Sequence, residues 1–280
     1  MTVIEVLTAA VGYLKNHGVE SPRLNAEHLL AHALGKKRLD LYLEFDRPLS
    51  DAERAPFRDL IRDRGKGKPL QHLLGTVEFC GRSFLSDHRA LVPRPETEQL
   101  AELAIQTLRN EATMTILDVG TGSGVVAITL ALAFPLAMIS ATDVSLDALT
   151  LARENALQHS VRIDFHEADL VPAAAGSFDA IVANLPYIAS DELVGLQREV
   201  RHDPPTALDG GPDGLRHIRK LVDAAPDYLA PEGILFLEIG HNQPAEVSAR
   251  LATLSYRDIR VRKDYQGVER FVTAVSPRQP

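Results

Sequence analysis

Cysteine is almost missing from this chain of 280 residues, which contains only Cys80. One cysteine cannot form an internal disulfide, and its rarity fits a reducing compartment. Basic residues are also in the minority, because 30 Lys and Arg stand against 38 Asp and Glu and give a net charge of −8. Nonspecific affinity for nucleic acid comes largely from cations that neutralise phosphates, so this balance excludes a protein that simply coats nucleic acid.

A long uninterrupted apolar segment is missing as well. The longest apolar stretch, VVAITLALAFPLAMI, is broken by Pro135 and follows a Gly-rich turn, so we expect a buried helix that runs into a strand rather than a membrane span. The first residues, MTVIEVLTAAVGYLKNHG, lack a basic leader and carry apolar residues at helical spacing. We therefore expect no signal peptide, no membrane partner and a cytoplasmic protein.

The hydrophobic pattern divides the chain into regions with different periods. Residues 1–74 are expected to form a small helical bundle, because residues 1–64 show only the helical period, with Ser21 and Pro22 at one helix start and a capping box at Ser50. Residues 75–90 alternate weakly and predict a hairpin linker. The basic stretch at residues 62–71 is best explained as a solvated helix end, and a contact with RNA is the less favoured alternative.

Residues 91–280 have the pattern of an α/β domain. The segments TILDV, MISATDV, RIDFHEADL, FDAIVA and GILFLEI are short and mostly apolar, with helical segments between most of them. This alternation predicts a mostly parallel sheet covered on both faces. Two alternating runs around residues 264–267 predict a terminal antiparallel pair.

A Gly-rich turn in ILDVGTGSGVVAITLA predicts one end of a binding site. Residues Gly120, Thr121, Gly122, Ser123 and Gly124 lie between a strand and a helix, where missing side chains and the helix dipole suit a ligand. The spacing is compressed relative to the dinucleotide fingerprint, which disfavours a pyrophosphate-bearing cofactor. Such glycines alone are a weak signal, since many α/β proteins turn this way for packing.

Two acids follow at the ends of the next two predicted strands. Asp143 has the spacing of an acid that binds ribose hydroxyls, and Asp169 could accept a hydrogen bond from an adenine amine with Leu170 against the base. Each acid has an alternative role as a helix N-cap. Because ligands of open α/β sheets lie beyond the carboxyl ends of the strands, we expect adenosine with a short charged tail, which is typical of S-adenosylmethionine.

Asn184, Leu185, Pro186 and Tyr187 follow the fourth predicted strand and should face the same crevice. The Asn184 carboxamide oxygen and the Leu185 carbonyl, restrained by the following proline, could accept both protons of a planar amino group. Tyr187 would supply an aromatic face for a flat conjugated group. Two acceptors would favour a pyramidal amide nitrogen and free its lone pair toward a sulfonium methyl, with catalysis by positioning and preorganised dipoles.

In these motifs the chain resembles the bacterial protein-(glutamine-N5) methyltransferases of the PrmC/HemK family, over nearly its whole length. The resemblance is carried by PLQHLLGTVEFCGRSF, LVPRPETEQL, ILDVGTGSG, ATDVSLDALTLARENA, FDAIVANLPYI, ALDGGPDGL and LEIGHNQ. It implies a helical N-terminal domain, a hairpin linker and a seven-stranded Rossmann-like methyltransferase domain, and we expect the helical bundle of residues 1–74 to recognise the substrate. It also implies S-adenosylmethionine as donor, S-adenosylhomocysteine as product, and the glutamine of the Gly-Gly-Gln loop in class I peptide chain release factors as substrate.

By the same resemblance, residues 120–124 and Asp143 fall on cofactor positions, Asn184 to Tyr187 fall on the substrate motif, and Asn184 also lies near the cofactor's methionine part. VPRPETE, with Arg94, Glu96 and Thr97, resembles a loop that borders the active site, and we assign it no chemical step. The sequence departs from the family at Leu185, where Pro is usual, and near Leu170, where some members carry an aromatic residue.

Alternatives to this function remain open at this point. An adenine-N6 or guanine-N2 methyltransferase acting on DNA or rRNA would use a similar motif, but the acidic balance and the helical bundle disfavour stable nucleic-acid binding. An NAD oxidoreductase is disfavoured by the compressed glycine turn, and a non-catalytic adaptor would keep the fold without transfer. His28 and His32 have a spacing that can bind metal, but no third ligand is evident and we predict no metal site.

Overall fold

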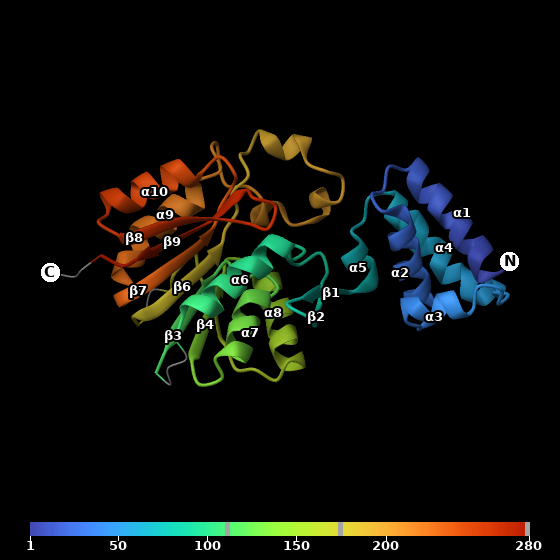
Figure 1. Ribbon diagram of the computed structural model, residues 1–280, viewed down its shortest axis with the longest axis horizontal. Helices are drawn as coiled ribbons and strands as arrows, with labels where there is room; N and C mark the ends of the chain where they lie inside the picture. Colours follow the sequence, from blue (N-terminus) through green and yellow to red (C-terminus); the bar gives the residue numbers. More distant parts are fainter. Residues whose placement is uncertain (110–112, 173–175, 278–280) are drawn as a thin grey trace. The chain divides into compact units, whose positions relative to one another are not determined.

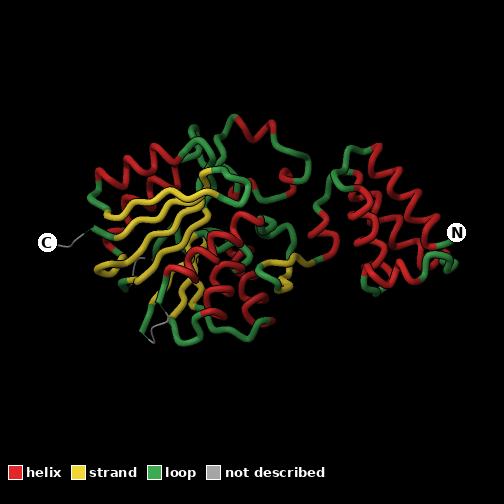
Figure 2. The backbone as a smooth tube through the Cα atoms, viewed as in Figure 1, coloured by secondary structure: helices red, strands yellow, loops and turns green. Residues whose placement is uncertain are grey.

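The computed structural model describes residues 1–109, 113–172 and 176–277, which fold into two compact units (Figures 1 and 2). The first unit combines Met1–Thr76 with the short segment Gln197–His202, and the second combines Val77–Leu196 with Asp203–Pro280. The sequence pattern did not indicate that a segment from within the α/β region belongs to the helical unit. Among the described helices, none combines the length and apolarity needed to cross a bilayer.

The first unit is the predicted helical bundle. Its described helices are α1 (Val3–Asn16), α2 (Pro22–Leu34), α3 (Arg38–Leu43), α4 (Asp51–Gly65) and α5 (Leu70–Leu74). Leu14, Leu29 and Leu30 are fully buried at its centre. The capping box of Ser50 and Glu53 forms as predicted at the start of α4. This small core therefore rests on the apolar stripes that the helical period indicated.

The N-cap of α2 differs from the prediction in its chemistry. Ser21 occupies the N-cap position, but its backbone is left-handed and its hydroxyl accepts no capping hydrogen bond. Asn25 instead donates its side-chain amide to the carbonyls of Glu20 and Ser21 at 3.0 and 3.1 Å. Pro22 at the first helical position and the left-handed Gly35 after the last turn agree with the prediction.

Buried Arg64 connects the segment Gln197–His202 to the helices of the first unit. Its guanidinium forms an ion pair with Glu199 and donates to the Asn25 carboxamide oxygen at 2.6 Å and to the Lys68 carbonyl at 3.1 Å. The Arg64 side chain is only 3% exposed, so its charge requires these partners. The short helix η2 (Val200–His202) belongs to this segment.

The predicted hairpin is formed by β1 (Thr76–Phe79) and β2 (Arg82–Leu85), and all of it except Thr76 belongs to the second unit. The two turn residues, Cys80 and Gly81, have φ values of +47° and +69°. Positive φ at both central residues matches a type I′ turn, whose twist suits a tight hairpin.

A seven-stranded sheet forms the centre of the second unit in the order β5-β4-β3-β6-β7-β9-β8. The strands are β3 (Thr115–Val119), β4 (Met138–Asp143), β5 (Asp164–Glu167), β6 (Phe178–Asn184), β7 (Leu229–Glu238), β8 (Arg257–Lys263) and β9 (Glu269–Val275). Strands β3 to β7 pair in parallel, and β9 pairs antiparallel with β7 and β8. The predicted fold class, a Rossmann-like class I methyltransferase sheet, is confirmed.

Helices cover both faces of this sheet (Figure 1). The described helices of the unit are α6 (Pro95–Thr107), α7 (Val125–Ala133), α8 (Leu146–Gln158), α9 (Arg216–Ala224), α10 (Pro244–Thr253), η1 (Glu192–Gly195), η3 (Pro205–Ala207) and η4 (Ala225–Asp227). Ile116 of β3 packs into the core cluster that contains α6 and α7, and its neighbour Leu117 packs into the cluster that contains α9 and α10. Because successive side chains face opposite clusters, most of the strand is apolar.

Candidate active site

A pocket lies at the carboxyl ends of the parallel strands, where the strand order reverses between β3 and β6. Open α/β sheets bind ligands at such a switch point. Of the residues predicted for the site, those that line the pocket are Gly120, Gly122, Asp143, Asp169, Leu170, Asn184, Leu185 and Pro186. Residues at or just after the ends of four strands therefore meet there, although they are far apart in the sequence.

The glycine turn allows the strand tips to approach each other closely. Gly120 has a φ of +72°, and a Cβ at this position would lie 3.0 Å from Cδ2 of Leu185. The backbone N–H groups of Gly120 and Thr121 both donate to the Thr142 carbonyl at 2.9 Å, which ties the turn to β4. Glycine is therefore needed at position 120 for two reasons: the backbone is left-handed, and the Leu185 side chain leaves little room for a Cβ.

Thr121 is not among the residues that line the pocket, and its side chain instead bonds to Asp118 at the end of β3. Its hydroxyl donates to Oδ2 of Asp118 at 2.7 Å, and the same oxygen accepts the Ala127 N–H at 3.1 Å. Asp118 therefore connects the end of β3 to the first turn of α7. Burial raises the pKa of this carboxyl to about 7.

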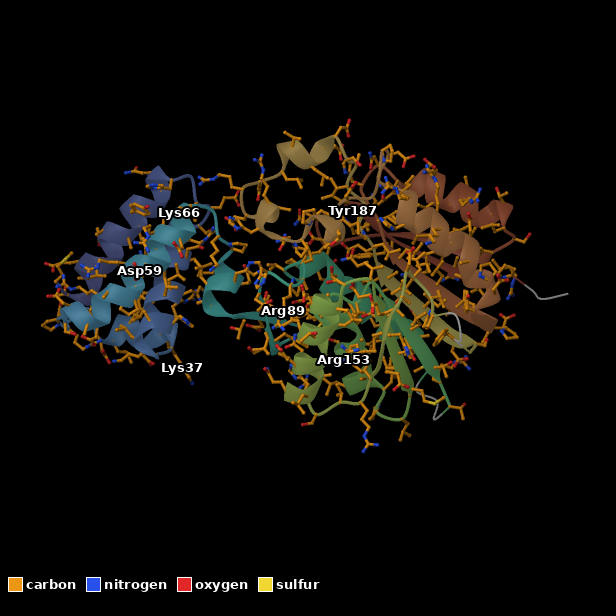
Figure 3. The ribbon with its side chains drawn as sticks, turned by 180° about the vertical axis from the view of Figure 1, so that it is seen from behind. Lys37, Asp59, Lys66, Arg89, Arg153 and Tyr187 are labelled. Atoms are coloured by element: carbon orange, nitrogen blue, oxygen red, sulfur yellow. The ribbon has the colours of Figure 1, made fainter. Side chains whose placement is uncertain are left out.

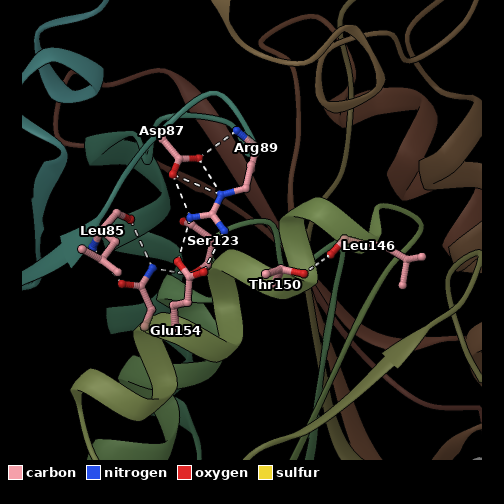
Figure 4. Close-up of polar contacts among 8 residues, drawn as sticks. Leu85, Asp87, Arg89, Ser123, Leu146, Thr150 and Glu154 are labelled. Atoms are coloured by element: carbon pink, nitrogen blue, oxygen red, sulfur yellow. Dashed lines mark hydrogen bonds and ion pairs between the residues drawn. The ribbon is translucent and has the colours of Figure 1, made fainter.

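Ser123 and Gly124 likewise contribute to packing. Asn155 of α8 is fully buried and donates to the Ser123 carbonyl at 2.9 Å and to the Leu85 carbonyl at 3.1 Å. It also accepts the Leu85 N–H at 2.7 Å, so one carboxamide joins the hairpin, α8 and the glycine turn (Figure 4). A Cβ on Gly124 would lie 3.0 Å from Cβ of Ala152. Direct ligand contacts from Thr121, Ser123 and Gly124 stay predictions.

Arg89 is among the residues that line the pocket, and its side chain lies beside those of Asp87 and Glu154 (Figure 4). Its guanidinium bonds the Asp87 carboxylate from its own loop and the Glu154 carboxylate of α8, with Nη2 lying 2.8 and 2.7 Å from the two acids. A guanidinium binds carboxylates well because it can donate two parallel hydrogen bonds to each. Both acids therefore favour the charged form of Arg89. The loop after β2 is therefore fastened to α8 at the pocket edge.

Asp143 is held in place by backbone donors. Its Oδ2 accepts the Gly122 N–H and its Oδ1 accepts the Ser145 N–H, both at 2.9 Å. The N-cap of α8 is Ser145, whose hydroxyl accepts the Ala148 N–H at 3.2 Å, so Asp143 does not serve as that cap. Burial raises the pKa of Asp143, opposed by these hydrogen bonds. Each oxygen keeps a lone pair for a ligand hydroxyl.

Leu170 adopts a conformation that is rare for a residue with a branched side chain. Its φ is +79°, and its carbonyl accepts the Thr142 hydroxyl at 2.6 Å. The side chain is buried against the pocket. Its neighbour Asp169 forms an exposed ion pair with Lys220 of α9, so a ligand amine at Asp169 would share that carboxylate with Lys220.

At the other end of the site, three hydrogen bonds connect four side chains. Asn184 ends β6 directly opposite Glu238, which ends β7. Nδ2 of Asn184 donates to the Thr97 hydroxyl at 2.8 Å, and this hydroxyl donates to Oε2 of Glu238 at 2.8 Å. The Tyr187 hydroxyl (labelled in Figure 3) donates to Oε1 of Glu238 at 3.3 Å. Burial and the Glu238 charge raise the pKa of Tyr187 above its usual range.

The two oxygen atoms proposed to accept hydrogen bonds from the substrate amide have no hydrogen-bond donor among the described residues. Within the described residues, no hydrogen bond reaches the carboxamide oxygen of Asn184 or the Leu185 carbonyl. Both residues line the pocket. A polar atom at a pocket wall without a protein partner is available to a ligand.

The backbone after these acceptors is fixed by glycines of the ALDGGPDGL motif. A Cβ on Gly210 would lie 2.7 Å from the Pro186 carbonyl oxygen, and one on Gly214 would lie 2.2 Å from the Tyr187 carbonyl oxygen. Buried Gln243 donates its Nε2 to the Tyr187 carbonyl at 3.0 Å and to the Gly214 carbonyl at 3.2 Å. The motif therefore permits a backbone contact that holds the loop after β6.

Both units match known families. Residues 5–75 match the PrmC N-terminal domain, and residues 94–211 match the methyltransferase small domain. A release factor glutamine methyltransferase of Geobacter sulfurreducens is 41% identical over 273 residues, which cover 97% of this chain and 95% of that protein. The chain belongs to the release factor glutamine methyltransferase family. A relative of the same name from Deinococcus radiodurans is 42% identical, with 98% of each chain covered.

Solved structures agree on the fold of the methyltransferase unit. A T. thermophilus 16S rRNA N2 methyltransferase, in complex with AdoMet and guanosine, matches with a TM-score of 0.52 and 17% identity, covering 72% of this chain and 49% of that chain. At this identity the likeness concerns the fold alone.

Within this member of the release factor glutamine methyltransferase family, sequence reasoning missed the roles of three residues. Thr97 lies in the motif VPRPETE, and Glu238 and Gln243 lie in the motif LEIGHNQ. The two motifs are the only sequence feature that singles out these three residues, and a motif does not indicate which side chains its members contact. Among the described residues, no group of three or more His, Cys, Asp or Glu could hold a metal ion.

Proposed function

We propose that this protein transfers a methyl group from S-adenosylmethionine to the N5 amide nitrogen of the glutamine in the Gly-Gly-Gln motif of class I peptide chain release factors. S-adenosylhomocysteine is the product. The observation that carries the proposal is the pair of uncommitted acceptors, the Asn184 carboxamide oxygen and the Leu185 carbonyl, at the wall of the switch-point pocket. Membership of the family supplies the substrate class.

The pocket residues fit S-adenosylmethionine. The turn at Gly120 and Gly122 presents backbone without side chains, Asp143 offers lone pairs to ribose hydroxyls, and buried Leu170 offers an apolar surface to adenine. Asp169 would accept from the adenine amine. When bound, the cofactor supplies an electrophilic methyl group on a positively charged sulfur.

The residues after β6 perform the transfer by positioning. An amide nitrogen is a weak nucleophile because its lone pair is delocalised into the carbonyl. The Asn184 oxygen and the Leu185 carbonyl each accept one hydrogen bond from the NH₂ of the glutamine amide, which orients the nitrogen and draws it toward pyramidal geometry. Once the nitrogen carries the methyl group, it loses one of its N–H protons. Fixed acceptors need no reorganisation during the reaction, and this is the main contribution of a preorganised site.

Leu185 replaces the proline that is usual in the family, and the loop compensates for it. The carbonyl of residue 185 is the group used, and Pro186 still restricts Leu185 to extended geometry. The side chain of Leu185 is buried beside Gly120, so it also packs the two halves of the site together. Tyr187 adds its ring near the amide, although its hydroxyl is bonded to Glu238 and the residue is absent from the pocket lining.

The helical unit, residues 1–74, is proposed to recognise the release factor, and residues 75–90 to act as the hairpin linker to the catalytic unit. The first unit matches the N-terminal domain of the family over residues 5–75. Its proposed partner acts in translation termination, so we assign the activity to the cytoplasm. We propose no stable complex with nucleic acid and no membrane partner.

Mass spectrometry of a class I release factor, incubated with this protein and S-adenosylmethionine, tests the function. We expect a gain of one methyl group on the Gly-Gly-Gln glutamine, and label found only in DNA or rRNA would overturn the proposal. Asn184→Ala should lower methyl transfer by roughly 100-fold, because one preorganised acceptor is lost, while cofactor binding is largely kept. Unchanged transfer by this variant would refute the two-acceptor mechanism.

A further inference from the structure

The orientation of the Asn184 side chain decides what it offers to a substrate. A carboxamide carries an acceptor oxygen and a donor NH₂ of nearly the same shape, so a half-turn of the group exchanges them. With the oxygen toward the pocket, Asn184 can accept a hydrogen bond from the N–H of the glutamine amide. With the NH₂ toward the pocket, donor would face donor, and one of the two required hydrogen bonds would be lost.

The neighbours of Asn184 determine this orientation through a one-way series of hydrogen bonds. An ionised Glu238 can only accept, so the single proton of the Thr97 hydroxyl points to Glu238 at 2.8 Å. The Thr97 oxygen must then accept from Asn184, and only Nδ2 can donate at 2.8 Å. Thr97 and Glu238 are 4% and 1% exposed, so water does not offer a substitute partner.

We propose that Thr97 and Glu238 are positioning residues for the amide transfer, and that together they hold the Asn184 oxygen toward the substrate. This inference rests on the proposed function and assigns a role to the VPRPETE loop. Neither residue touches the reacting atoms. Thr97 lies in the first turn of α6 and Glu238 at the end of β7, so two separate elements fix one side chain on β6.

The charge on Glu238 makes the arrangement sensitive to pH. Burial raises the pKa of Glu238 to about 7. The charge of Glu96 in α6 also raises this pKa, whereas the charge of Arg270 in β9 and the hydrogen bond from the Tyr187 hydroxyl lower it. A protonated Glu238 can donate to Thr97, whose own proton then turns toward Asn184 and favours the wrong carboxamide orientation. The active arrangement is therefore present above this pKa, and turnover should fall as the pH falls through it.

The direct test compares Thr97→Val with Thr97→Ser and with Thr107→Val, the same substitution at an exposed position of α6. We expect Thr97→Val to lower kcat by about 10- to 100-fold, since a small misplacement of a positioning group costs that much. Thr97→Ser keeps the hydroxyl and should stay within about threefold of the wild type, and S-adenosylmethionine affinity should change little in each. Wild-type kcat in Thr97→Val would overturn the inference.

The pH dependence gives a second test that does not depend on the Thr97 variants folding. The wild-type protein should lose kcat as the pH falls below about 7, and Glu238→Gln should lack this loss because the carboxamide does not titrate. The same loss in Glu238→Gln, or a flat wild-type profile, would overturn the inference. Absence of release factor methylation by the wild type would instead overturn the proposed function.

Discussion

Gly214 offers the sharpest test of how the loop after β6 is held. Its φ is +75°, and a Cβ there would lie 2.2 Å from the Tyr187 carbonyl oxygen and 2.7 Å from Nε2 of Gln243. Gly267 is a matched control, because its φ is +85° and a Cβ there would meet no atom within 4 Å. The comparison of Gly214→Ala with Gly267→Ala therefore separates the collision from the cost of the left-handed conformation.

The size of the effect follows from the geometry. Real Cβ contacts are essentially never under 3.0 Å, so the Tyr187 carbonyl must move by about 0.8 Å. A displacement near 1 Å at a positioning group can cost about 100-fold in rate. Both variants should lose about 1–2 kcal/mol of stability from the left-handed backbone. Gly214→Ala should lose roughly 1–3 kcal/mol more, because the buried hydrogen bonds of Gln243 are strained or broken.

The assay measures kcat/KM for release factor methylation, S-adenosylmethionine binding and urea unfolding for both variants. We expect Gly214→Ala to lose on the order of 100-fold in kcat/KM while still binding cofactor, and Gly267→Ala to stay near the wild type in activity. If Gly214→Ala were as active as Gly267→Ala, the reasoning would be refuted, because methylation would then not depend on the position of the Tyr187 carbonyl.

Two further predictions concern the support of the glycine turn. Asn155→Ala should lower the free energy of unfolding by roughly 2–4 kcal/mol in urea titrations, because it leaves the backbone groups of part-buried Leu85 and the carbonyl of buried Ser123 without this partner. An effect no larger than that of Gln158→Ala would contradict this. The pKa of Asp118 is raised from 3.8 to about 7 in the folded protein, so its contribution to stability is present at low pH and lost as the pH rises between these values. Asp118→Asn should flatten that part of the stability profile, and identical profiles would argue against a buried, titrating Asp118.

Local patterns in the sequence were enough to predict the architecture. The period-3.6 stripes of the first 74 residues predicted helices, and the continuous apolar strands predicted a sheet covered on both faces, because each pattern follows from which sides of an element are buried. The glycine turn, Asp143 and Asn184 could be assigned to one crevice for a similar reason. Residues at the carboxyl ends of neighbouring parallel strands share one edge of the sheet.

Only the tertiary structure shows which side chains outside the crevice make hydrogen bonds to the residues that line it. Thr97 and Glu238 are separated by 141 residues, and no periodicity connects a first-turn threonine of one helix with an acid ending a strand beyond it. The return of Gln197–His202 to the helical unit was equally invisible, since it depends on contacts between residues far apart in the sequence, among them the Arg64–Glu199 ion pair and the hydrogen bond from Arg198 to the Lys66 carbonyl. Periodicity records burial along an element, whereas a hydrogen bond between distant elements depends on how the chain is threaded through space.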